Sequence, residues 1–408
     1  MSQVKIPLNQ IISREALTPI LAFVSQCNYA GVNVWLVGGS VRDGILGNPS
    51  KDLDLVVDVD VLKLMSKIQM PFQHFERFST AKTQIANFPV DIASARTEIY
   101  TKPGALPKVL LSDIESDLAR RDFSMNSIAI SLNKGSEGVV LDPYNGLQDI
   151  NTKTIRILHS DSFKDDATRI LRAIKYSVRL GFDLAPQTKK ILKNNINFLN
   201  SVSSSRLRRE LISITDEPLG ASILLYAHNV GVFSEVFRNL NNSEFKNFLL
   251  SAKKSSLSGI PLFMYLLSQL NITDSPPRIS ISKKEKSLTE KLQNALTSKD
   301  LNKHGLAPSG IKRELKHFSE NEIQILLKIS NQKMAFNIKL FLSKAHLRPL
   351  LTFNDLLIMG LPENKSLRVA MDLLSDAVID GKVKGRRSQV TYVQRLMLEG
   401  LDNESNIH

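Results

Sequence analysis

The feature that most constrains the fold of this chain is a short hydrophobic run followed at once by two glycines. The run covers residues 34–37, ends in Gly38 and Gly39, and is followed by a helical pattern that begins near Val41. This pattern predicts a buried strand that turns sharply into a helix. Glycines at such a turn let the backbone approach a phosphate, which the first N–H groups of the helix can bind.

A second hydrophobic run carries a pair of acidic residues, Asp52 and Asp54. Alternate side chains of a strand point to the same face, so both carboxylates are expected to project together. Burying an unpaired carboxylate is costly, and a bound cation is the usual remedy. Gly-Gly turns and Asp-x-Asp pairs each arise often by chance, so either feature alone has a purely structural explanation. Side by side, they predict Mg²⁺-dependent phosphoryl or nucleotidyl transfer.

A third carboxylate, Asp91, lies in the later hydrophobic run at residues 89–96. It would join the first two if this run forms a neighbouring strand, although aspartates at strand ends are also common without any function. A polar loop with a glycine and two prolines is predicted over residues 97–108. Loops of this length inside compact domains tend to be functional or mobile.

A compact polar set follows at Arg120, Arg121, Asp122 and Asn126. These side chains are suited to contacts with a phosphate and a ribose at one site. A salt-bridged helix end is the alternative explanation, and it would be preferred without the earlier glycine and aspartate motif.

From about residue 151 onward the chain shows helical patterns and no convincing strand. One helix is predicted from Asp165, with Asp166, Arg169 and Arg172 on roughly one face and Lys175 continuing the stripe. Such stripes are usually solvated faces. An Asp followed by an Arg one turn later also offers an acceptor and a donor that can recognise the edge of a base.

The composition sets the broad class. The 408 residues include 42% hydrophobic residues and carry a net charge of +13, which predicts two or more domains and a surface that attracts polyanions such as nucleic acid. The single cysteine, Cys27, is expected to be a buried thiol in a reducing cytoplasm. Neither a signal peptide nor a membrane-spanning run is apparent, so a cytoplasmic protein is predicted.

Taken together, these motifs resemble those of the bacterial class II tRNA nucleotidyltransferases, the CCA-adding enzymes and their relatives the poly(A) polymerases. The similar segments occur in the family's order: LVGGSVRD at 36–43, DLD at 52–54, RRDFSMN at 120–126, DPYNG at 142–146, DDATR at 165–169 and RLRREL at 206–211. The resemblance implies an α+β fold, with a nucleotidyltransferase head of the polymerase-β type containing a mixed sheet, followed by an all-helical neck, body and tail. The implied divisions are a catalytic head at 1–155, a helical region with base recognition at 156–270 and a tRNA-binding body and tail at 271–408.

The resemblance also implies the reaction and the roles of individual residues. CTP, CTP and then ATP would be added to the 3′ end of tRNA with release of pyrophosphate and without a nucleic-acid template. Asp52 and Asp54 would hold Mg²⁺, and Asp91 would be the third catalytic carboxylate. The implied nucleotide-binding residues are Gly38, Gly39, Arg42, Arg121, Asp122, Asn126, Asp166, Arg169, Arg172 and Lys175.

The sequence departs from the family pattern at several positions. Asp165 stands where Glu is usual, Lys175 where Arg is common, and Ser205 where Glu is common. These departures affect fine specificity more than reaction type. Three alternatives therefore stay open: a relative that adds only CC or only A, a poly(A) polymerase, and a catalytically inert RNA-binding protein. The presence of the loop at 97–108 favours full CCA addition, because the family's flexible loop lies there.

Overall fold

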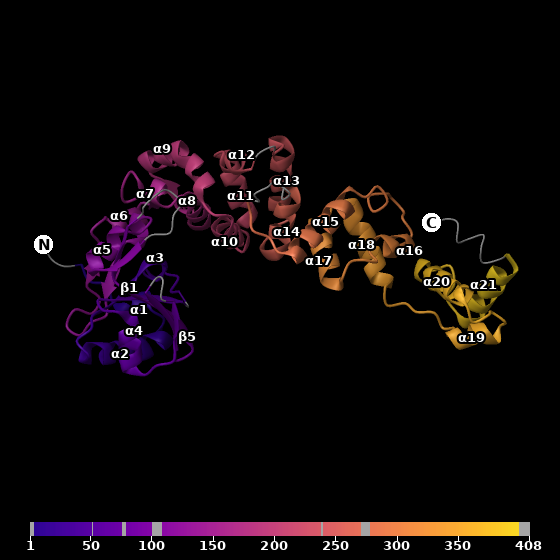
Figure 1. Ribbon diagram of the computed structural model, residues 1–408, viewed down its shortest axis with the longest axis horizontal. Coiled ribbons are helices and arrows are strands. Elements are labelled where there is room, and N and C mark those ends of the chain that lie inside the picture. The colour runs from indigo at the N-terminus through magenta and orange to yellow at the C-terminus, as the bar shows by residue number, and fades with distance from the viewer. Residues whose placement is uncertain are drawn as a thin grey trace. The chain divides into compact units, whose positions relative to one another are not determined.

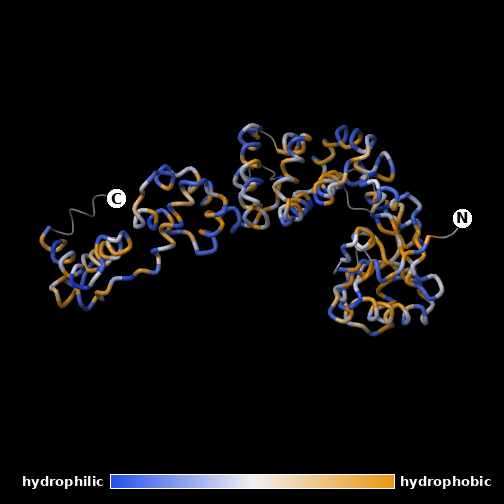
Figure 2. The backbone as a smooth tube through the Cα atoms, turned by 180° about the vertical axis from the view of Figure 1, so that it is seen from behind, coloured by the Kyte–Doolittle hydropathy of each residue, from blue (hydrophilic) through white to orange (hydrophobic). Residues whose placement is uncertain are grey.

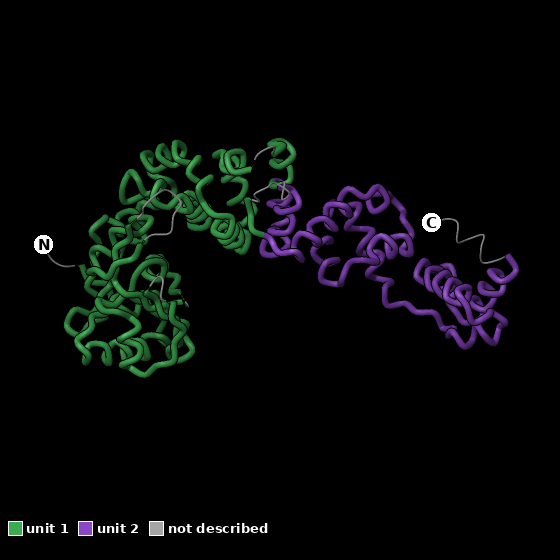
Figure 3. The backbone as a smooth tube through the Cα atoms, in the orientation of Figure 1, with its two compact units in different colours: residues 1–249, 273–280 green, residues 250–272, 281–408 purple. Residues whose placement is uncertain are grey.

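The computed structural model describes residues 4–50, 52–75, 79–99, 108–237, 240–270 and 278–399 (Figure 1). The chain divides into two compact units, drawn in different colours in Figure 3. The first contains residues 1–249 and 273–280, and the second contains residues 250–272 and 281–408. The predicted boundary at residue 155 does not separate compact units, so the three-part division of the chain stays a prediction.

The first unit is built on a seven-stranded sheet with the strand order β3-β4-β5-β2-β1-β8-β9. The strands are β1 (Val34–Val37), β2 (Leu53–Val57), β3 (Gln73–Phe75), β4 (Thr80–Ile85), β5 (Phe88–Ser94), β8 (Ala129–Ser131) and β9 (Val140–Leu141). Strands β2 and β5 pair in parallel, whereas the other neighbours are antiparallel. The prediction of an α+β fold with a mixed sheet in the N-terminal part is confirmed.

Helices α2 (Arg14–Tyr29) and α4 (Val61–Ile68) contact strands of this sheet, and Figure 1 shows both beside it. The strands alternate accordingly: in β4, Ala81, Thr83 and Ile85 are buried while Lys82 and Gln84 are exposed. Because strand side chains alternate between faces, one face of the sheet carries the core and the other carries polar groups.

A two-residue turn joins β4 to β5. Ile85 pairs with Phe88 across it, and the turn residues Ala86 and Asn87 both have positive φ, 48° and 71°. This backbone matches the twist of a hairpin, and Asn tolerates it better than Ala does. The turn therefore fixes which residue of β4 stands opposite which residue of β5.

The remaining elements of the first unit are mostly helical. Short strand pairs are formed by β6 (Arg96–Ile99) with β7 (Lys108–Leu111) and by β10 (Thr154–Ile155) with β11 (Asp183–Leu184). The helices are α1 (Leu8–Ile11), α3 (Gly38–Ile45), α5 (Ile114–Ala119), α6 (Gly146–Asn151), α7 (Ser162–Asp165), α8 (Thr168–Leu180), α9 (Pro186–Asn195), α10 (Ser204–Thr215), α11 (Gly220–Asn229) and α12 (Val232–Val236), with 3-10 turns η2 (Ser124–Asn126) and η3 (Ile196–Ser201).

Three local predictions differ from the structure. The helix predicted from Asp165 begins only at Thr168, as α8, and Asp165 is instead the last residue of α7. Asp166 between them has an extended backbone, and its carboxylate accepts hydrogen bonds from the backbone N–H and hydroxyl of Thr168. The ends of the loop predicted over 97–108 are strands β6 and β7, and residues 100–107 lie outside the described residues. Strands β10 and β11 were not predicted, since two residues are too few for a periodic signal.

The second unit is helical where it is described. Helix α13 (Asn242–Lys254) leads into it, and its helices are α14 (Gly259–Gln269), α15 (Lys283–Thr297), α16 (Pro308–Glu314), α17 (Glu320–Ile329), α18 (Gln332–Lys344), α19 (Phe353–Ile358), α20 (Lys365–Asp380) and α21 (Arg386–Glu399). Hydrophobic and hydrophilic residues alternate along these helices, as Figure 2 shows. Leu356, Leu374 and Val393 join α19, α20 and α21 into one buried cluster. Across the described ranges, no helix is long and apolar enough to span a membrane.

Candidate active site

The polar face of the sheet carries a row of charged side chains on three neighbouring strands. Asp54 of β2 is paired in register with Asp91 of β5, which is in turn opposite Lys82 of β4. Lys82 Nζ lies 2.8 Å from Asp91 Oδ2. Asp52 precedes β2, and its charge acts on Asp54 and on Lys82. The sheet thus brings Asp54 and Asp91 to one face, together with a lysine that the sequence analysis did not identify, and Asp52 lies next to the start of β2.

Asp54 is the member of this row that faces the neighbouring pocket. Loss of hydration in the pocket raises the pKa of Asp54 to about 6; Arg121 opposes this rise, while Asp91 and Asp52 add to it. Asp54 as a whole residue is nevertheless exposed to solvent. The charged form of a carboxylate that is disfavoured by lost hydration and by like-charged neighbours is stabilised by a bound cation.

The glycine turn lies directly against Asp54. Gly38 has a φ of 71° and begins α3 immediately after β1. A Cβ atom at Gly38 would lie 2.9 Å from Nη1 of Arg121 and 3.6 Å from Oδ2 of Asp54. Glycine is required here both by the backbone conformation and by the close approach of these two groups. A carboxylate and a guanidinium therefore both lie close to the first residue of a helix.

A buried aspartate holds two arginines at the edge of the pocket. Asp117 of α5 is fully buried, and its carboxylate accepts hydrogen bonds of 2.6 Å from Arg120 and 2.8 Å from Arg121. Burial alone would raise the pKa of Asp117, but Arg121 and Arg120 hold it below its usual range. Arg120 also donates a 2.9 Å bond to Glu98 of β6. The charges of these arginines are thereby fixed in place before any ligand binds.

Asp122 and Asn126 connect this segment to α8. Oδ1 of Asp122 accepts hydrogen bonds from the Asn126 amide and from the Phe123 backbone, and Arg172 lies 2.7 Å from Oδ2. Burial works to raise the pKa of Asp122, yet Arg172 and these donors lower it overall. Asp122 in turn raises the pKa of Arg172, which keeps the guanidinium charged.

On the helical side, Arg169 and Asp166 are held by separate partners. Arg169 is 5% exposed and donates 2.7 Å bonds to the hydroxyl of Ser162 and to the backbone carbonyl of Arg120. Asp166 accepts a 2.8 Å bond from Arg206 of α10. Both side chains are thus oriented by their neighbours, as recognition of a base edge requires.

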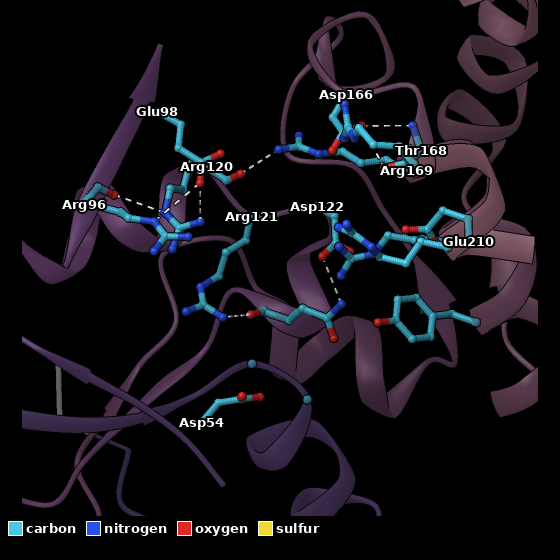
Figure 4. A pocket seen from close by; sticks show the side chains of 17 residues that line it. Asp54, Arg96, Glu98, Arg120, Arg121, Asp122, Asp166, Thr168, Arg169 and Glu210 are labelled. Atoms are coloured by element: carbon cyan, nitrogen blue, oxygen red, sulfur yellow. Dashed lines mark hydrogen bonds and ion pairs between the residues drawn. The ribbon is translucent and has the colours of Figure 1, made fainter. Parts of the chain in front are cut away.

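These groups enclose one pocket of about 490 Å³ within the first unit. Figure 4 shows Asp54 on one side of it and Asp166, Arg169 and Glu210 on another, with Arg120 and Arg121 between them. Arginines outnumber carboxylates among the lining residues. A polar cavity with this balance of charge suits a polyanionic ligand such as a nucleoside triphosphate.

Most of the predicted nucleotide-binding residues line this pocket. The lining includes Gly38, Gly39, Asp54, Arg121, Asp122, Asn126, Asp166, Arg169 and Arg172. Asp52, Asp91, Arg42 and Lys175 are not among the lining residues. The functional roles of these four residues stay predictions, and so do the roles of the residues that line the pocket.

The structure places Arg42 and Lys175 differently from the expectation of direct nucleotide contact. Arg42 is 2% exposed, and its guanidinium donates to Asn126 and to Asp43. Lys175 donates a 2.8 Å bond to the hydroxyl of Ser213. In this conformation Arg42 supports Asn126, and Lys175 joins α8 to α10.

Several lining residues were missed by the sequence analysis. Arg96 and Glu98 belong to β6, and Tyr176 lies on α8 with Arg42 Cζ 5.0 Å from its ring centroid. The signal available for Tyr176 was its position one helical turn after Arg172. No comparable signal marked Arg96 and Glu98, which reach the pocket only through the sheet topology. Arg206, Arg209 and Glu210 also line it, from a segment noted only as a supporting motif.

The residues present suit a divalent cation by their chemistry. Asp52 and Asp54 offer hard oxygen donors two residues apart, and the charge of Asp52 raises the pKa of Asp54 while Arg121 and Lys82 lower it. Among the residues with described positions, no three His, Cys, Asp or Glu side chains already converge into a metal-holding group. The carboxylates fit a cation that also takes ligands from its substrate.

Comparison with known proteins places this site in a family. Residues 34–156 match the model of the poly(A) polymerase head domain. The A-adding tRNA nucleotidyltransferase of Halalkalibacterium halodurans is 29% identical over 379 residues, which cover 89% of this chain and 88% of that protein. Residues 34–156 therefore form a poly(A) polymerase-type head domain, and the chain as a whole is similar to the class II tRNA nucleotidyltransferases. The chain is a nucleotidyltransferase, and enzymes of this kind generally use divalent metal ions.

Other relatives define how far the similarity extends. A second A-adding tRNA nucleotidyltransferase, from Geobacter sulfurreducens, is 28% identical over 95% of this chain, which spans only 48% of that longer protein. Relatives named CC-adding or CCA-adding match 37–54% of the chain. The Thermotoga maritima CCA-adding enzyme complexed with tRNA has the same fold, with a TM-score of 0.77 and 22% identity over 97% of this chain and all of that one.

Proposed function

We propose that this chain adds CCA to the 3′ end of tRNA, using CTP and ATP and no nucleic-acid template. The observation that carries the proposal is the close approach of both Asp54 and Arg121 to the Gly38 turn, in a pocket lined with arginines. Similar proteins act on tRNA by name, and the net charge of +13 favours a polyanionic partner. Because its substrates are tRNA and free nucleotides, we place the protein in the cytoplasm.

Different walls of the pocket bind different parts of the nucleotide. Arg121 and the N–H groups of the Gly38 turn hold the triphosphate, whereas Asp122 and Asn126 hold the sugar and adjoining phosphate. Asp166 and Arg169 contact the edge of the base, and Arg172 completes the pocket. A wrong base would leave these buried groups unpaired, which is how a protein surface can replace a template.

The transfer itself is a displacement at the α-phosphorus. The 3′-hydroxyl oxygen of the tRNA forms a bond to this phosphorus while the bond to the bridging oxygen of the β-phosphate breaks. Pyrophosphate leaves with the electron pair, and the hydroxyl proton passes to a carboxylate of the Asp52, Asp54 and Asp91 row. Asp52 and Asp54 would hold Mg²⁺, which supplies activation of the hydroxyl and neutralisation of the leaving charge.

A second candidate is addition of the terminal A alone. It is favoured by two relatives that match 89% and 95% of this chain, both of which are named A-adding. The pocket geometry serves either reaction, because both use the same carboxylates and the same phosphate contacts.

In the deciding experiment, tRNA transcripts that end before the CCA, after C and after CC are incubated with Mg²⁺ and labelled nucleotide. The nucleotide is CTP alone, ATP alone or both together. Addition of two C residues and one A supports the first candidate. Extension only of the transcript that ends in CC, and only by A, selects the second. Long A tails would identify a poly(A) polymerase, and no incorporation at any end would refute both candidates.

A further inference from the structure

A second hollow lies on the same sheet face, on the far side of the carboxylate row from the nucleotide pocket. It is an open groove of about 710 Å³ within the first unit, formed by β3, β4, β5 and the segment before β3. Its lining includes Phe72, Gln73, Lys82, Gln84, Pro89 and Asp91. Asp54 lines the nucleotide pocket and Asp91 lines the groove, and these two residues are paired in register on neighbouring strands.

We propose that this groove binds the 3′-terminal nucleotide of the RNA acceptor, an inference that rests on the proposed nucleotidyl transfer. In an in-line displacement, the attacking oxygen and the leaving group lie on opposite sides of the phosphorus. The arginines that would take the leaving pyrophosphate lie on the Asp54 side. The attacking hydroxyl must then enter from the Asp91 side, where the groove begins.

The charges in the groove suit a single phosphodiester. Lys82 has an exposed side chain, and its ammonium group has three N–H donors, one of which is directed at Asp91 in the 2.8 Å contact. The ammonium group can therefore bind a backbone phosphate while it stays beside the carboxylate row. Lys82 would link the last phosphodiester of the acceptor to the site of reaction.

The other lining groups suit a base. The Phe72 ring and Pro89 offer flat apolar surfaces, on which any base can stack. Gln73 and Gln84 are exposed, and each amide carries both donors and an acceptor for a base edge. The Thr83 hydroxyl donates a 2.7 Å bond to the Pro71 carbonyl, which ties the segment that carries Phe72 to β4. The groove is therefore formed without its ligand.

The first test measures steady-state kinetics of the full-length protein with Phe72→Ala, using the tRNA transcript that the unmodified protein extends. We expect KM for the transcript to rise about tenfold, as loss of one stacked base predicts, while KM for the nucleotide changes less than about twofold. Phe75→Ala is the matched control, because Phe75 is an exposed aromatic residue of the adjoining strand β3 that does not line the groove. An unchanged KM for the transcript in Phe72→Ala would overturn the proposal.

A second pair of variants tests the charge requirement without disturbing the core. Gln84 is exposed, so Gln84→Glu and Gln84→Lys should both fold normally. The acidic variant should raise KM for the transcript and the basic variant should lower it, by a few-fold each, and added salt should reduce the difference. Equal values of KM in the two variants would count against a phosphodiester in the groove.

A binding measurement separates this proposal from the proposed function. A tRNA transcript with 4-thiouridine as its 3′-terminal nucleotide is irradiated with the protein, and the cross-linked peptide is identified by mass spectrometry. Cross-links to residues 71–73 or 82–84 support the groove even if the protein extends no RNA, in which case only the proposed function fails. Extension of tRNA with cross-links confined to other segments would overturn the groove and leave the function standing.

Discussion

Arg169 donates a 2.7 Å hydrogen bond from Nη2 to the backbone carbonyl of Arg120. This bond joins a residue assigned to base recognition on α8 to the segment that places Arg121 over the Gly38 turn. Through Arg120, the same segment is also bonded to Asp117 and to Glu98. The groups for the base and for the phosphates are therefore held by one continuous set of contacts.

Arg169→Lys should impair the choice of nucleotide more than the chemistry. Lysine keeps the charge but lacks the planar guanidinium group, which donates to Ser162 and Arg120 and has a further N–H for a base. We expect discrimination between correct and incorrect nucleotides to fall by about 1–3 kcal/mol, measured as the ratio of kcat/KM values. Arg179→Lys is the control, because Arg179 lies on the same helix and pairs with Asp43 and Glu217 outside the pocket lining. Unaltered discrimination in Arg169→Lys would contradict base recognition by this residue.

Asp54→Asn should abolish nucleotide incorporation and leave tRNA binding intact. The amide keeps the shape of the side chain and removes the charge that a cation requires. We expect kcat to fall more than about 100-fold, the upper range found for residues that only support a metal ligand. The measurement pairs incorporation assays with tRNA binding by filter retention. Asp58→Asn serves as a control, since Asp58 binds Asn33 beyond the end of β2; an equal loss of tRNA binding in folded Asp54→Asn would overturn the assigned role.

Asp117→Asn should destabilise the first unit strongly. Removing this buried charge leaves Arg120 and Arg121 without their shared partner, and loss of one member of a buried ion pair costs roughly 3–5 kcal/mol. The effect is measured as a change in the free energy of unfolding in urea. Asp113→Asn makes the same chemical change at the exposed N-cap of the same helix and should have little effect. Similar stabilities for the two variants would show that the buried pairs do not support the unit.

Cys27 should report on unfolding of the first unit. The thiol is fully buried, and burial raises its pKa from 9.0 to about 12, with a backbone hydrogen bond acting weakly in the opposite direction. The folded state therefore holds the proton more tightly, so its contribution to stability is present below pH 9 and is lost as pH rises from 9 toward 12. Iodoacetamide should modify Cys27 in denaturing urea and spare it in the native protein at neutral pH. Rapid modification of the native protein would contradict this burial.

The β4–β5 turn offers a stabilising change. Ala86 has a φ of 48°, where a side chain clashes with the backbone, so Ala86→Gly should relieve about 1 kcal/mol. Thermal unfolding of the two proteins, followed by circular dichroism, measures the gain. A lower melting temperature in Ala86→Gly would show that the greater entropy of glycine in the unfolded chain outweighs the removal of the side-chain clash.

The sequence patterns were sufficient to predict the strand at residues 34–37, the turn at Gly38 and the Asp52 and Asp54 pair beside it. Each of these features depends on neighbours within a few residues. The meeting of Asp54 with Asp91 could be proposed but not located, since it requires the parallel pairing of β2 and β5. Lys82 and Glu98 were not anticipated as members of the site, because only the sheet topology brings them to it. The burial of Arg42 likewise follows from tertiary packing, which spacing along a helix does not reveal.

The turn at Ala86 and Asn87 has a consequence for how this protein can change over evolution. It sets Lys82 opposite Asp91, and side chains in a strand alternate between faces. Insertion of a single residue there would carry Lys82 to the helix-covered face. Asp91 would then lose the Lys82 ammonium group as its partner, even if every residue named in the nucleotide pocket were kept. We therefore expect insertions in natural relatives to be excluded from this hairpin, although none of its residues lines the nucleotide pocket.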